Sequence, residues 1–585
     1  MKVKSYQASF VSGELSPQLW GRIDQTLYAN AAARLRNVYV SPEGGTPRRE
    51  GTRLLSRTYQ DEKPRLISFA FNTEQAYLHA LTPGRITVYR DDTPVAAVTA
   101  DALSGLTASV LETLNWTQSA DTLILVHPDI QPIKITRSSH TVWNVTPLTF
   151  THIPQFDFGS GNEPVMSATR GWPRSIAFKY GRLWLGGLKS RPQTILGSVV
   201  GDFFNLDEGT GLDDQAINIT IDDDRVNAVM NLFPGRSLHV FTTGGEFVIQ
   251  GALGDPVTPG KIAQQLVKYT LHGSSVARPV SVDGATVFVE NGGNVVRQFV
   301  YDDLEQSYNA PNISILSPHL VRNPARMDVR PATTTLPADY MFLVNEDGTM
   351  AVLNTLREQK LLGWSLFETQ GDYEDVAVVN RVTYAAVRRV INGQTRRFIE
   401  KFDPECLTDA AIKAQTDAFV QCLPFVFSPD GATDWDGLGE LEGAEVQLIG
   451  DGYVLDPAVV AGGAVSLAFP VTELEAGLDF RAEVQTLPAE LSFNGQSTMG
   501  QFKALVGLKM RLHESRGVVV KQSNGRVYRP AWKRLGLGVL DAPVRLFSGV
   551  KALCLGGSDR DVQITITQDA PTEFHLLSLN LEVGV

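Results

Sequence analysis

Ile67-Ser-Phe-Ala-Phe71, Ala76-Tyr-Leu-His-Ala80 and Ile86-Thr-Val-Tyr89 are three short apolar runs that follow one another closely. The segments between them contain Asn, Gly and Pro, the residues that form tight turns. Short apolar runs bounded by turn residues are typical of buried β-strands. This stretch therefore predicts successive strands joined by tight turns.

The same pattern recurs from about Arg65 to Asp403: an apolar strand is followed by a tight turn and a second apolar strand. Asp347-Gly and Asn392-Gly are hairpin-turn dipeptides within this region. The pairs recur at irregular intervals of roughly 40–50 residues, the length of a propeller blade. No WD or kelch signature accompanies them. We predict an irregular β-propeller-like domain, with stacked β-sandwiches as the rival architecture. Further members of the pattern are Leu123-Ile-Leu-Val, Ile176-Ala-Phe with Arg182-Leu-Trp-Leu, Leu238-His-Val-Phe with Glu246-Phe-Val-Ile, and Tyr340-Met-Phe-Leu-Val with Met350-Ala-Val-Leu.

The whole chain has 585 residues, which is too many for a single hydrophobic core of ordinary size. We predict a mainly β protein with three regions: an N-terminal loop-helix assembly segment at 1–64, the propeller-like domain at 65–403, and a β-rich C-terminal domain at 404–585. In the last region strands are expected at Val446-Gln-Leu-Ile and Val562-Gln-Ile-Thr-Ile.

The helix in the first region is expected between Asp24 and Val38. Leu27, Ala31, Leu35 and Val38 have the spacing of one helical face. Asp24 can cap the N-terminus of such a helix, and Ser-Pro-Glu-Gly-Gly at 41–45 ends it.

The composition is that of a soluble globular protein, with 43% hydrophobic and 20% charged residues. The net charge is −12, whereas proteins that grip DNA electrostatically are usually basic. Tight DNA binding is therefore not expected. The three cysteines form no CxxC pair, which argues against a disulfide framework or a zinc knuckle. No apolar run reaches the roughly 20 residues that span a bilayer, and the first residues do not resemble a signal peptide.

The common catalytic motifs are absent from the sequence. It contains no Gly-x-Ser-x-Gly, no Gly-x4-Gly-Lys-Ser/Thr and no His-Glu-x-x-His. Asp222-Asp-Asp224 lacks the alternating spacing of a calcium loop and is expected to be a solvated turn. The nine histidines lie far apart and are expected to be structural. We predict no enzyme activity, no metal and no cofactor.

The densest basic cluster is Arg48-Arg49 with Arg53 and Arg57 close by. It could contact an acidic partner or the DNA backbone. The alternative is a set of solvated arginines at a strand edge.

The N-terminal stretch from Ser9 to Gly51, which contains Gly-Glu-Leu-Ser-Pro at 13–17 and Gly-Gly-Thr-Pro-Arg-Arg-Glu-Gly at 44–51, resembles the signature of the nozzle proteins of short-tailed phages. These proteins are also called tail tubular protein B or phage stabilisation proteins. Later segments are similar to the same family in the same order. They are Trp116 to Arg137, Gly171 to Phe178 with Arg182 to Asn205, Arg225 to Phe247, and Leu441-Glu-Gly with Thr486-Leu-Pro.

The resemblance implies a structural virion protein of the phage tail, assembled in the host cytoplasm, that forms and gates the DNA ejection channel. It implies a homohexamer below the portal and adaptor proteins, a docking face for the adaptor, and attachment of tail fibres or spikes. DNA would pass without tight binding, and no membrane insertion is expected. Six copies would carry about −72, and if part of that charge faces the channel, repulsion of the duplex is expected.

The N-terminal segment, rich in Gly and Pro and carrying arginines, is expected to contact a neighbouring subunit or the adaptor. The expected contact residues are Arg22, Arg36, Asn37, Arg48, Arg49 and Arg53. The alternative functions are a tail adhesin that binds host glycans and an envelope-degrading tail enzyme.

Overall fold

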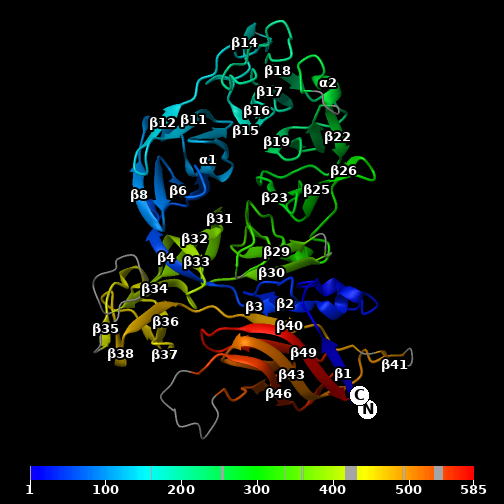
Figure 1. Ribbon diagram of the computed structural model, residues 1–585, viewed down its shortest axis with the longest axis vertical. Coiled ribbons are helices and arrows are strands. Elements are labelled where there is room, and N and C mark those ends of the chain that lie inside the picture. Colours follow the sequence, from blue (N-terminus) through cyan, green and yellow to red (C-terminus); the bar gives the residue numbers. More distant parts are fainter. Residues whose placement is uncertain are drawn as a thin grey trace.

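The computed structural model describes all residues except 1, 160, 252–255, 335, 357–358, 360, 416–430, 491, 494–495, 533–543 and 585. It is mainly β, as predicted. In Figure 1 a ring of sheets stands above a base that contains both chain ends.

Seven four-stranded antiparallel units follow one another around the ring within the described residues. The first is β5 (Arg65–Ala70), β6 (Ala76–Thr82), β7 (Arg85–Arg90) and β8 (Thr93–Val98). The second is β9 (Asn115–Ser119), β10 (Thr122–His127), β11 (Ile130–Arg137) and β12 (Trp143–Pro147). The third is β15 (Pro173–Lys179), β16 (Arg182–Leu188), β17 (Thr194–Gly197) and β18 (Ile217–Thr220).

The fourth unit is β19 (Val229–Pro234), β20 (Leu238–Thr242), β21 (Glu246–Ile249) and β22 (Leu266–Thr270). The fifth is β23 (Val280–Val282), β24 (Ala285–Val289), β25 (Val296–Asp302) and β26 (Ser307–Asn309). The sixth is β27 (Arg326–Arg330), β28 (Tyr340–Val344), β29 (Met350–Leu356) and β30 (Leu361–Phe367).

The seventh unit closes the ring with a strand from the beginning of the chain. It is β31 (Asp372–Val379), β32 (Val382–Ile391), β33 (Gln394–Asp403) and β4 (Gly51–Arg57), in that order. β4 pairs antiparallel with β33, with Asp403 opposite Gly51 and Phe398 opposite Arg57. The chain then continues from β4 into β5, the inner strand of the first unit, which contacts β31. A ring of four-stranded units closed by strand exchange between its ends is a β-propeller.

The base is built around a β-sandwich made by both chain ends. Phe10, Leu35 and Val38 share its buried core with C-terminal residues such as Val520 and Leu581. One sheet consists of β1 (Lys2–Gln7), β49 (His575–Gly584), β43 (Lys503–Ser515) and β46 (Phe547–Cys554), with β3 (Thr46–Pro47) and β47 (Ser558–Asp559) at its margins. The facing strands are β2 (Ala32–Arg36), β40 (Glu483–Thr486), β48 (Ile564–Gln568), β44 (Val518–Gln522) and β45 (Val527–Tyr528).

A second part of the base, residues 431–479 with β34, is a small lobe beside the seventh unit, with its own buried core around Trp435 and Leu441. It contains β34 (Asp409–Gln415), β39 (Glu473–Leu478), β36 (Glu445–Gly450) and β37 (Tyr453–Val459), and the pair β35 (Ala432–Trp435) and β38 (Val465–Val471). Two single parallel bridges, Arg53 to Ala411 and Arg36 to Leu366, join the propeller to the lobe and to the sandwich.

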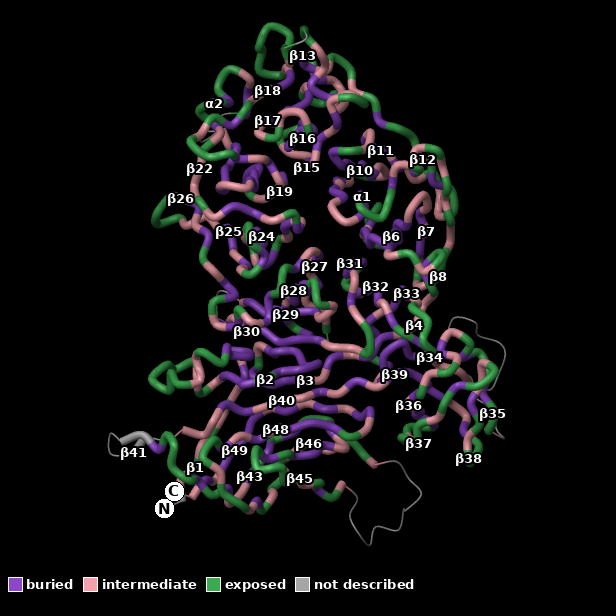
Figure 2. The backbone as a smooth tube through the Cα atoms, turned by 180° about the vertical axis from the view of Figure 1, so that it is seen from behind, coloured by how far each residue is buried: buried purple, intermediate pink, exposed green. Residues whose placement is uncertain are grey.

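Short elements complete the fold. They are the hairpins β13 (Gln155–Asp157) with β14 (Asn162–Pro164) and β41 (Ser492–Phe493) with β42 (Gln496–Ser497), the helices α1 (Ala108–Glu112) and α2 (Ile262–Gln265), and the 3-10 turns η1 (Pro17–Leu19), η2 (Thr26–Asn30), η3 (Tyr59–Asp61), η4 (Asp101–Leu103), η5 (Pro318–Leu320) and η7 (Gly439–Leu441). Figure 2 shows that buried residues are concentrated in the strands of each unit and of the base.

The prediction of a helix between Asp24 and Val38 is wrong. The segment forms the 3-10 turn η2 and then the strand β2, and Asp24 pairs with Arg22 instead of capping a helix. Of the four residues of the expected apolar face, Ala31, Leu35 and Val38 are buried and Leu27 is 38% exposed, and β2 pairs with β40. A ladder to a strand far away in the sequence, which local spacing cannot reveal, outweighs the helical periodicity.

Candidate functional site

The N-terminal segment that carries the family resemblance lies at the joint between the propeller and the base (Figure 1). Its backbone bonds to both halves. The N–H of Glu14 donates to the carbonyl of Trp364 in the propeller, 2.9 Å, and the N–H of Gly51 donates to the carbonyl of Cys406, 2.8 Å. The N–H of Arg48 donates to the carbonyl of Phe574 in the base, 2.8 Å.

Two glycines of this segment allow the close approach. Gly13 has a φ of +67°, and a Cβ there would collide with the backbone of Trp364. A Cβ on Gly51 would collide with the carbonyl oxygens of Thr408 and Cys406. At both positions only the absence of a side chain lets two backbones come together.

Arg36 is the first predicted contact residue, and the structure places it in a buried ionic cluster. Its guanidinium bonds the carboxylate of Glu14 and donates to Glu368 at 3.1 Å. The carboxylate of Glu14 also lies 2.9 Å from Nε2 of His319 and accepts the N–H of Leu35. Burial opposes ionisation, but the bonds from His319 and Arg36 hold the pKa of Glu14 below its ordinary value. This cluster fastens the N-terminal segment to the propeller.

Asn37 and Arg49 form a second buried cluster. The side chain of Arg49 is 0% exposed and donates to Asp409 at 2.8 and 2.6 Å. Oδ1 of Asn37 accepts from Nε of Arg49, 2.9 Å, and from the N–H of Glu368, 2.9 Å. Asn37 has a φ of 54°, a conformation that Asn tolerates better than most residues. Burial opposes ionisation, yet Arg49 holds the pKa of Asp409 below its usual value.

The buried cluster extends into the propeller through β4 and the seventh unit. Arg389 donates to Glu400 at 2.7 Å from both Nε and Nη2, and Thr52 of β4 bonds Glu400 as well. Thr52 lies 3.3 Å from Asp409, which connects the two ion pairs. Because buried charges require partners, these interactions fix how the propeller, the lobe and the N-terminal segment meet.

The other predicted contact residues lie apart. Arg48 stacks on the ring of Phe480, 3.9 Å from its centroid, and donates to the carbonyl of Leu407, 2.6 Å. Arg53 is 20% exposed and pairs with Asp92 at 2.9 Å. Arg22 is 53% exposed and pairs with Asp24 at 2.8 Å. Three of the six predicted contact residues therefore meet around Glu368: Arg36, Asn37 and Arg49. Arg48 lies beside them. Of the six, only Arg22 is largely exposed to solvent.

A polar cluster at the inner ends of the propeller strands could not be recognised in the sequence. The guanidiniums of Arg65 and Arg278 both stack on Trp116, at 4.9 and 4.4 Å from the ring centroid. Burial raises the pKa of Asp328, which lines the same cavity, to about 6. The cavity that these side chains line is small, ≈ 60 Å³.

Neighbouring inner strands are also joined by uncharged side chains. Nδ2 of Asn115 donates to Oδ1 of Asn231 at 2.9 Å, and Asn231 donates to the carbonyl of Ala277 at 3.2 Å. The hydroxyl of Ser175 accepts the N–H of Leu232 at 2.7 Å. These bonds tie four successive units of the propeller together near its axis.

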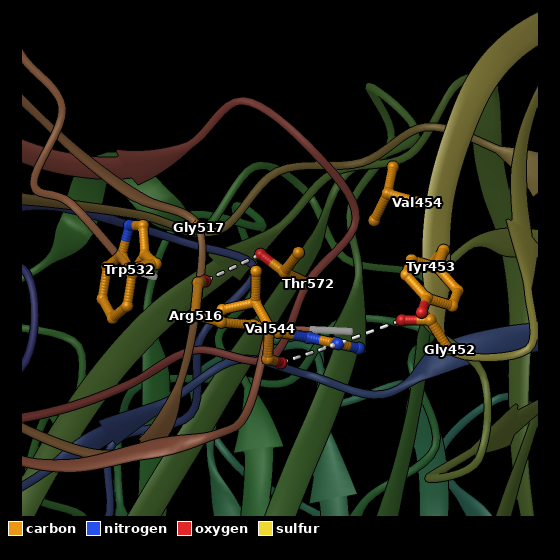
Figure 3. A pocket seen from close by; sticks show the side chains of 8 residues that line it. All are labelled: Gly452, Tyr453, Val454, Arg516, Gly517, Trp532, Val544 and Thr572. Atoms are coloured by element: carbon orange, nitrogen blue, oxygen red, sulfur yellow. Dashed lines mark hydrogen bonds between the residues drawn. The ribbon is translucent and has the colours of Figure 1, made fainter. Parts of the chain in front are cut away.

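A larger cavity lies in the base between the lobe and the sandwich (Figure 3). Its volume is ≈ 230 Å³, and Tyr453, Arg516, Trp532 and Thr572 are among the residues that line it. Arg516 donates to the carbonyls of Gly452, 3.1 Å, and Val544, 3.3 Å. Arg516 therefore joins the lobe to the sandwich here, and the described lining residues include no acid–base pair.

Within the described residues no group of three or more His, Cys, Asp or Glu side chains could hold a metal ion. Cys406 is buried and Cys554 is exposed, whereas Cys422 lies outside the described residues. Among the helices that the structure describes, none has the length and apolar character needed to cross a membrane.

No family model matches the chain, and no curated protein matches it. Solved structures with some likeness include the RRP9 WD40 repeats, 10% identical over 61% of this chain and 100% of that chain, with a TM-score of 0.36. BBS1N in complex with ARL6DN is 11% identical over 61% and 99%, with a TM-score of 0.34. Chaetomium thermophilum Raptor is 9% identical over 61% and 29%, with a TM-score of 0.37. These values are too low to say anything about function, and the fold assignment rests on the strand pairings.

Proposed function

We propose that this chain is a subunit of the tail nozzle of a short-tailed phage, a structural protein whose copies surround the DNA ejection channel. The observation that supports this most is the position of the segment resembling the nozzle signature. Its glycines and arginines are the residues that hold the propeller on the base. The resemblance therefore involves the residues that set the architecture of the whole subunit.

The packing inside the propeller indicates which path DNA would take through the proposed nozzle. At the inner ends of the strands, Arg65, Trp116 and Arg278 pack together and leave only a small cavity. A nucleic acid strand does not fit in that space. In the proposed nozzle the channel is therefore enclosed between copies of the chain, and the net charge of −12 per copy disfavours tight binding of the duplex.

The proposed partners are five further copies, the tail adaptor, and fibres or spikes, in a virion assembled in the host cytoplasm. Arg22 is the exposed residue of the N-terminal segment through which a neighbouring subunit or the adaptor could be contacted. Deleting residues 9–53 is not a clean test of that contact, because the deletion also removes β2, β3 and the first residues of β4. The variant Arg22→Glu leaves these strands intact.

The proposal is tested by silencing the gene for this chain during infection and examining the particles by electron microscopy and nuclease protection. Heads that fill with DNA but lose it, and that lack the distal part of the tail, are expected. Particles with complete tails and full infectivity would refute the nozzle assignment. Particles with complete tails that fail only to adsorb would favour the adhesin.

A further inference from the structure

The small lobe of the base is strongly acidic. Residues 431–479 contain ten acidic residues and no Lys, Arg or His, so the lobe carries most of the net charge of −12. The acids are Asp434, Asp436, Glu440, Glu442, Glu445, Asp451, Asp456, Glu473, Glu475 and Asp479.

Several of these carboxylates have no cationic neighbour. Asp436, Glu445 and Asp456 are exposed and form no ion pair within the described part of the chain. Others have structural roles inside the lobe. Asp451 accepts the N–H groups of Thr472 and Glu473, and Glu442 accepts that of Gly462. Asp436, Glu445 and Asp456 are therefore free to act at the surface.

The sheet formed by β1, β49, β43 and β46 has the opposite character on its outer face. One face of the sheet is packed in the sandwich core, and alternate residues point away from that core. Lys4, Lys509 and Arg511 are exposed on the outer face and form no ion pair with any residue that the structure describes. The face also presents Tyr6, 63% exposed, and Val550, 50% exposed.

Strand register places these side chains on one surface, which we call the basic face. Lys509 lies opposite Asn580 on one side and Ala552 on the other, and Asn580 lies opposite Tyr6. Arg511 follows two residues later and lies opposite Val550. One acid, Glu582, lies opposite Lys4 at the end of the face. No element of the described part of the chain covers this face, and exposed apolar groups rimmed by polar or charged residues mark interaction sites.

The acidic lobe and the basic face are separate surfaces of the base. In Figure 1 the lobe strands β35 and β38 are at the left edge of the base, β43 and β46 of the basic face lie in the middle, and β1 and the chain ends are at the right. Two complementary surfaces at different places on one subunit produce a head-to-tail contact, which gives a closed ring when the rotation between copies closes.

We propose that the acidic lobe of one copy docks on the basic face of the next. This inference rests on the proposed nozzle function and specifies which surfaces join neighbouring copies. A second copy is the favoured occupant because the lobe of the chain itself supplies the exposed carboxylates of Asp436, Glu445 and Asp456 to match the cations of the face. DNA or an unrelated acidic protein on the basic face is an alternative that the experiment distinguishes.

The experiment is sedimentation velocity of the full chain over a wide range of concentration at low and high salt. The wild-type chain is expected to associate at low salt and to dissociate as salt rises, because the contact is electrostatic. K509E/R511E and E445K/D456K are each expected to weaken association about tenfold or more. Combining all four substitutions in one chain again places opposite charges at these four positions and is expected to recover part of the association that each pair of reversals removes.

The matched control is R225E/R381E, which changes the net charge as K509E/R511E does but at exposed propeller positions. It is expected to associate like the wild-type chain. Circular dichroism of every variant confirms that the fold is kept.

A second measurement locates the contact directly. Cys554 is exposed on the basic face and Asp456 lies on the lobe. In a chain with Asp456→Cys and Cys422→Ser, a bifunctional thiol reagent is expected to link the thiol introduced on the lobe of one copy to Cys554 of another. Peptide mapping would identify the link.

Association that is unchanged by either pair of reversals, or no rescue in the fourfold variant, would overturn the proposed contact. Binding of a DNA oligonucleotide that K509E/R511E abolishes, without any self-association of the wild type, would assign the basic face to nucleic acid. A chain that stays monomeric at every concentration and salt also refutes the contact. It leaves the nozzle assignment standing, because neighbouring copies in a ring can be joined through the adaptor or through other surfaces.

Discussion

His79 in β6 is buried without a hydrogen-bond partner for either ring nitrogen among the described residues. Its ring stacks on Phe69, 5.4 Å between centroids, and meets Trp143 edge-on at 4.6 Å. Burial lowers the pKa of His79 to about 3. A neutral histidine in an aromatic core has a structural role and makes stability depend on pH.

The pH dependence has a definite sign. Between about pH 6.5 and pH 3, the unfolded chain binds a proton at His79 that the folded chain does not. Stability from this residue is fully present above about pH 6.5 and is lost as the pH falls toward 3. His79→Phe is expected to remove a slope of up to about 1.4 kcal/mol per pH unit. Urea unfolding at several pH values measures it; equal slopes for the two proteins would contradict the assignment.

The Arg49–Asp409 pair joins residues 360 positions apart in the sequence. Asp409→Asn leaves Arg49 buried without its counter-charge and is expected to lower the free energy of unfolding by about 3–5 kcal/mol. The pKa of Asp409 is lower in the folded protein than in the unfolded chain. The contribution of Asp409 to stability is therefore fully present above its pKa in the unfolded chain, and it is lost as the pH falls through its pKa in the folded protein.

Denaturant unfolding at neutral pH measures this loss. Arg22→Ala, which removes an exposed pair, is the control and is expected to change stability by less than about 1 kcal/mol. Equal effects of the two substitutions would show that the buried cluster does not hold the joint.

At the scale of elements, β4 is the strand on which closure of the propeller depends. Gly51 begins β4, and a Cβ there would meet the carbonyls of Thr408 and Cys406. Gly51→Ala is expected to lower the free energy of unfolding by about 1–3 kcal/mol, because neither backbone segment can move apart without disturbing the strand pairing.

Gly439→Ala provides the comparison, since nothing lies within 4 Å of a Cβ at that position. Thermal unfolding of both variants gives the difference. A Gly51→Ala protein as stable as the Gly439→Ala protein would mean that the joint is more open than the structure describes.

The sequence pattern identified many of the propeller strands but not how the ring closes. The runs beginning at Ile67, Ala76 and Ile86 are β5, β6 and β7, because each strand is buried and bounded by turn residues. The closing strand β4 precedes the repeats and pairs with β33, so no local pattern signals it. The helix expected between Asp24 and Val38 was wrong for the same reason, since β2 is formed by distant partners.

The same limit applies to the candidate site. The sequence shows a cluster of arginines in a loop-rich segment, but it does not show which of these arginines are exposed. Arg49 is enclosed by Asp409 and the backbone of Glu368, both far away in the sequence. The cluster of Arg65, Trp116 and Arg278 is assembled from three propeller units and has no sequence motif.

At the scale of the whole molecule, the N-terminal segment connects a propeller to a base that carries an acidic lobe and, on a separate surface, a basic face. Ion pairs and hydrogen bonds of Arg36 and Arg49 connect the N-terminal segment with Glu368 of the propeller and Asp409 of the lobe. The proposed nozzle uses the base for the contacts between neighbouring copies.

The most direct test is a cryo-electron microscopy map of virions that contain this chain, with the structure fitted into the tail. The account predicts sixfold density beneath the adaptor, a narrow channel enclosed between subunits, and each acidic lobe against the basic face of the next copy. Density for the chain at a fibre tip, or its absence from the virion, would contradict the account.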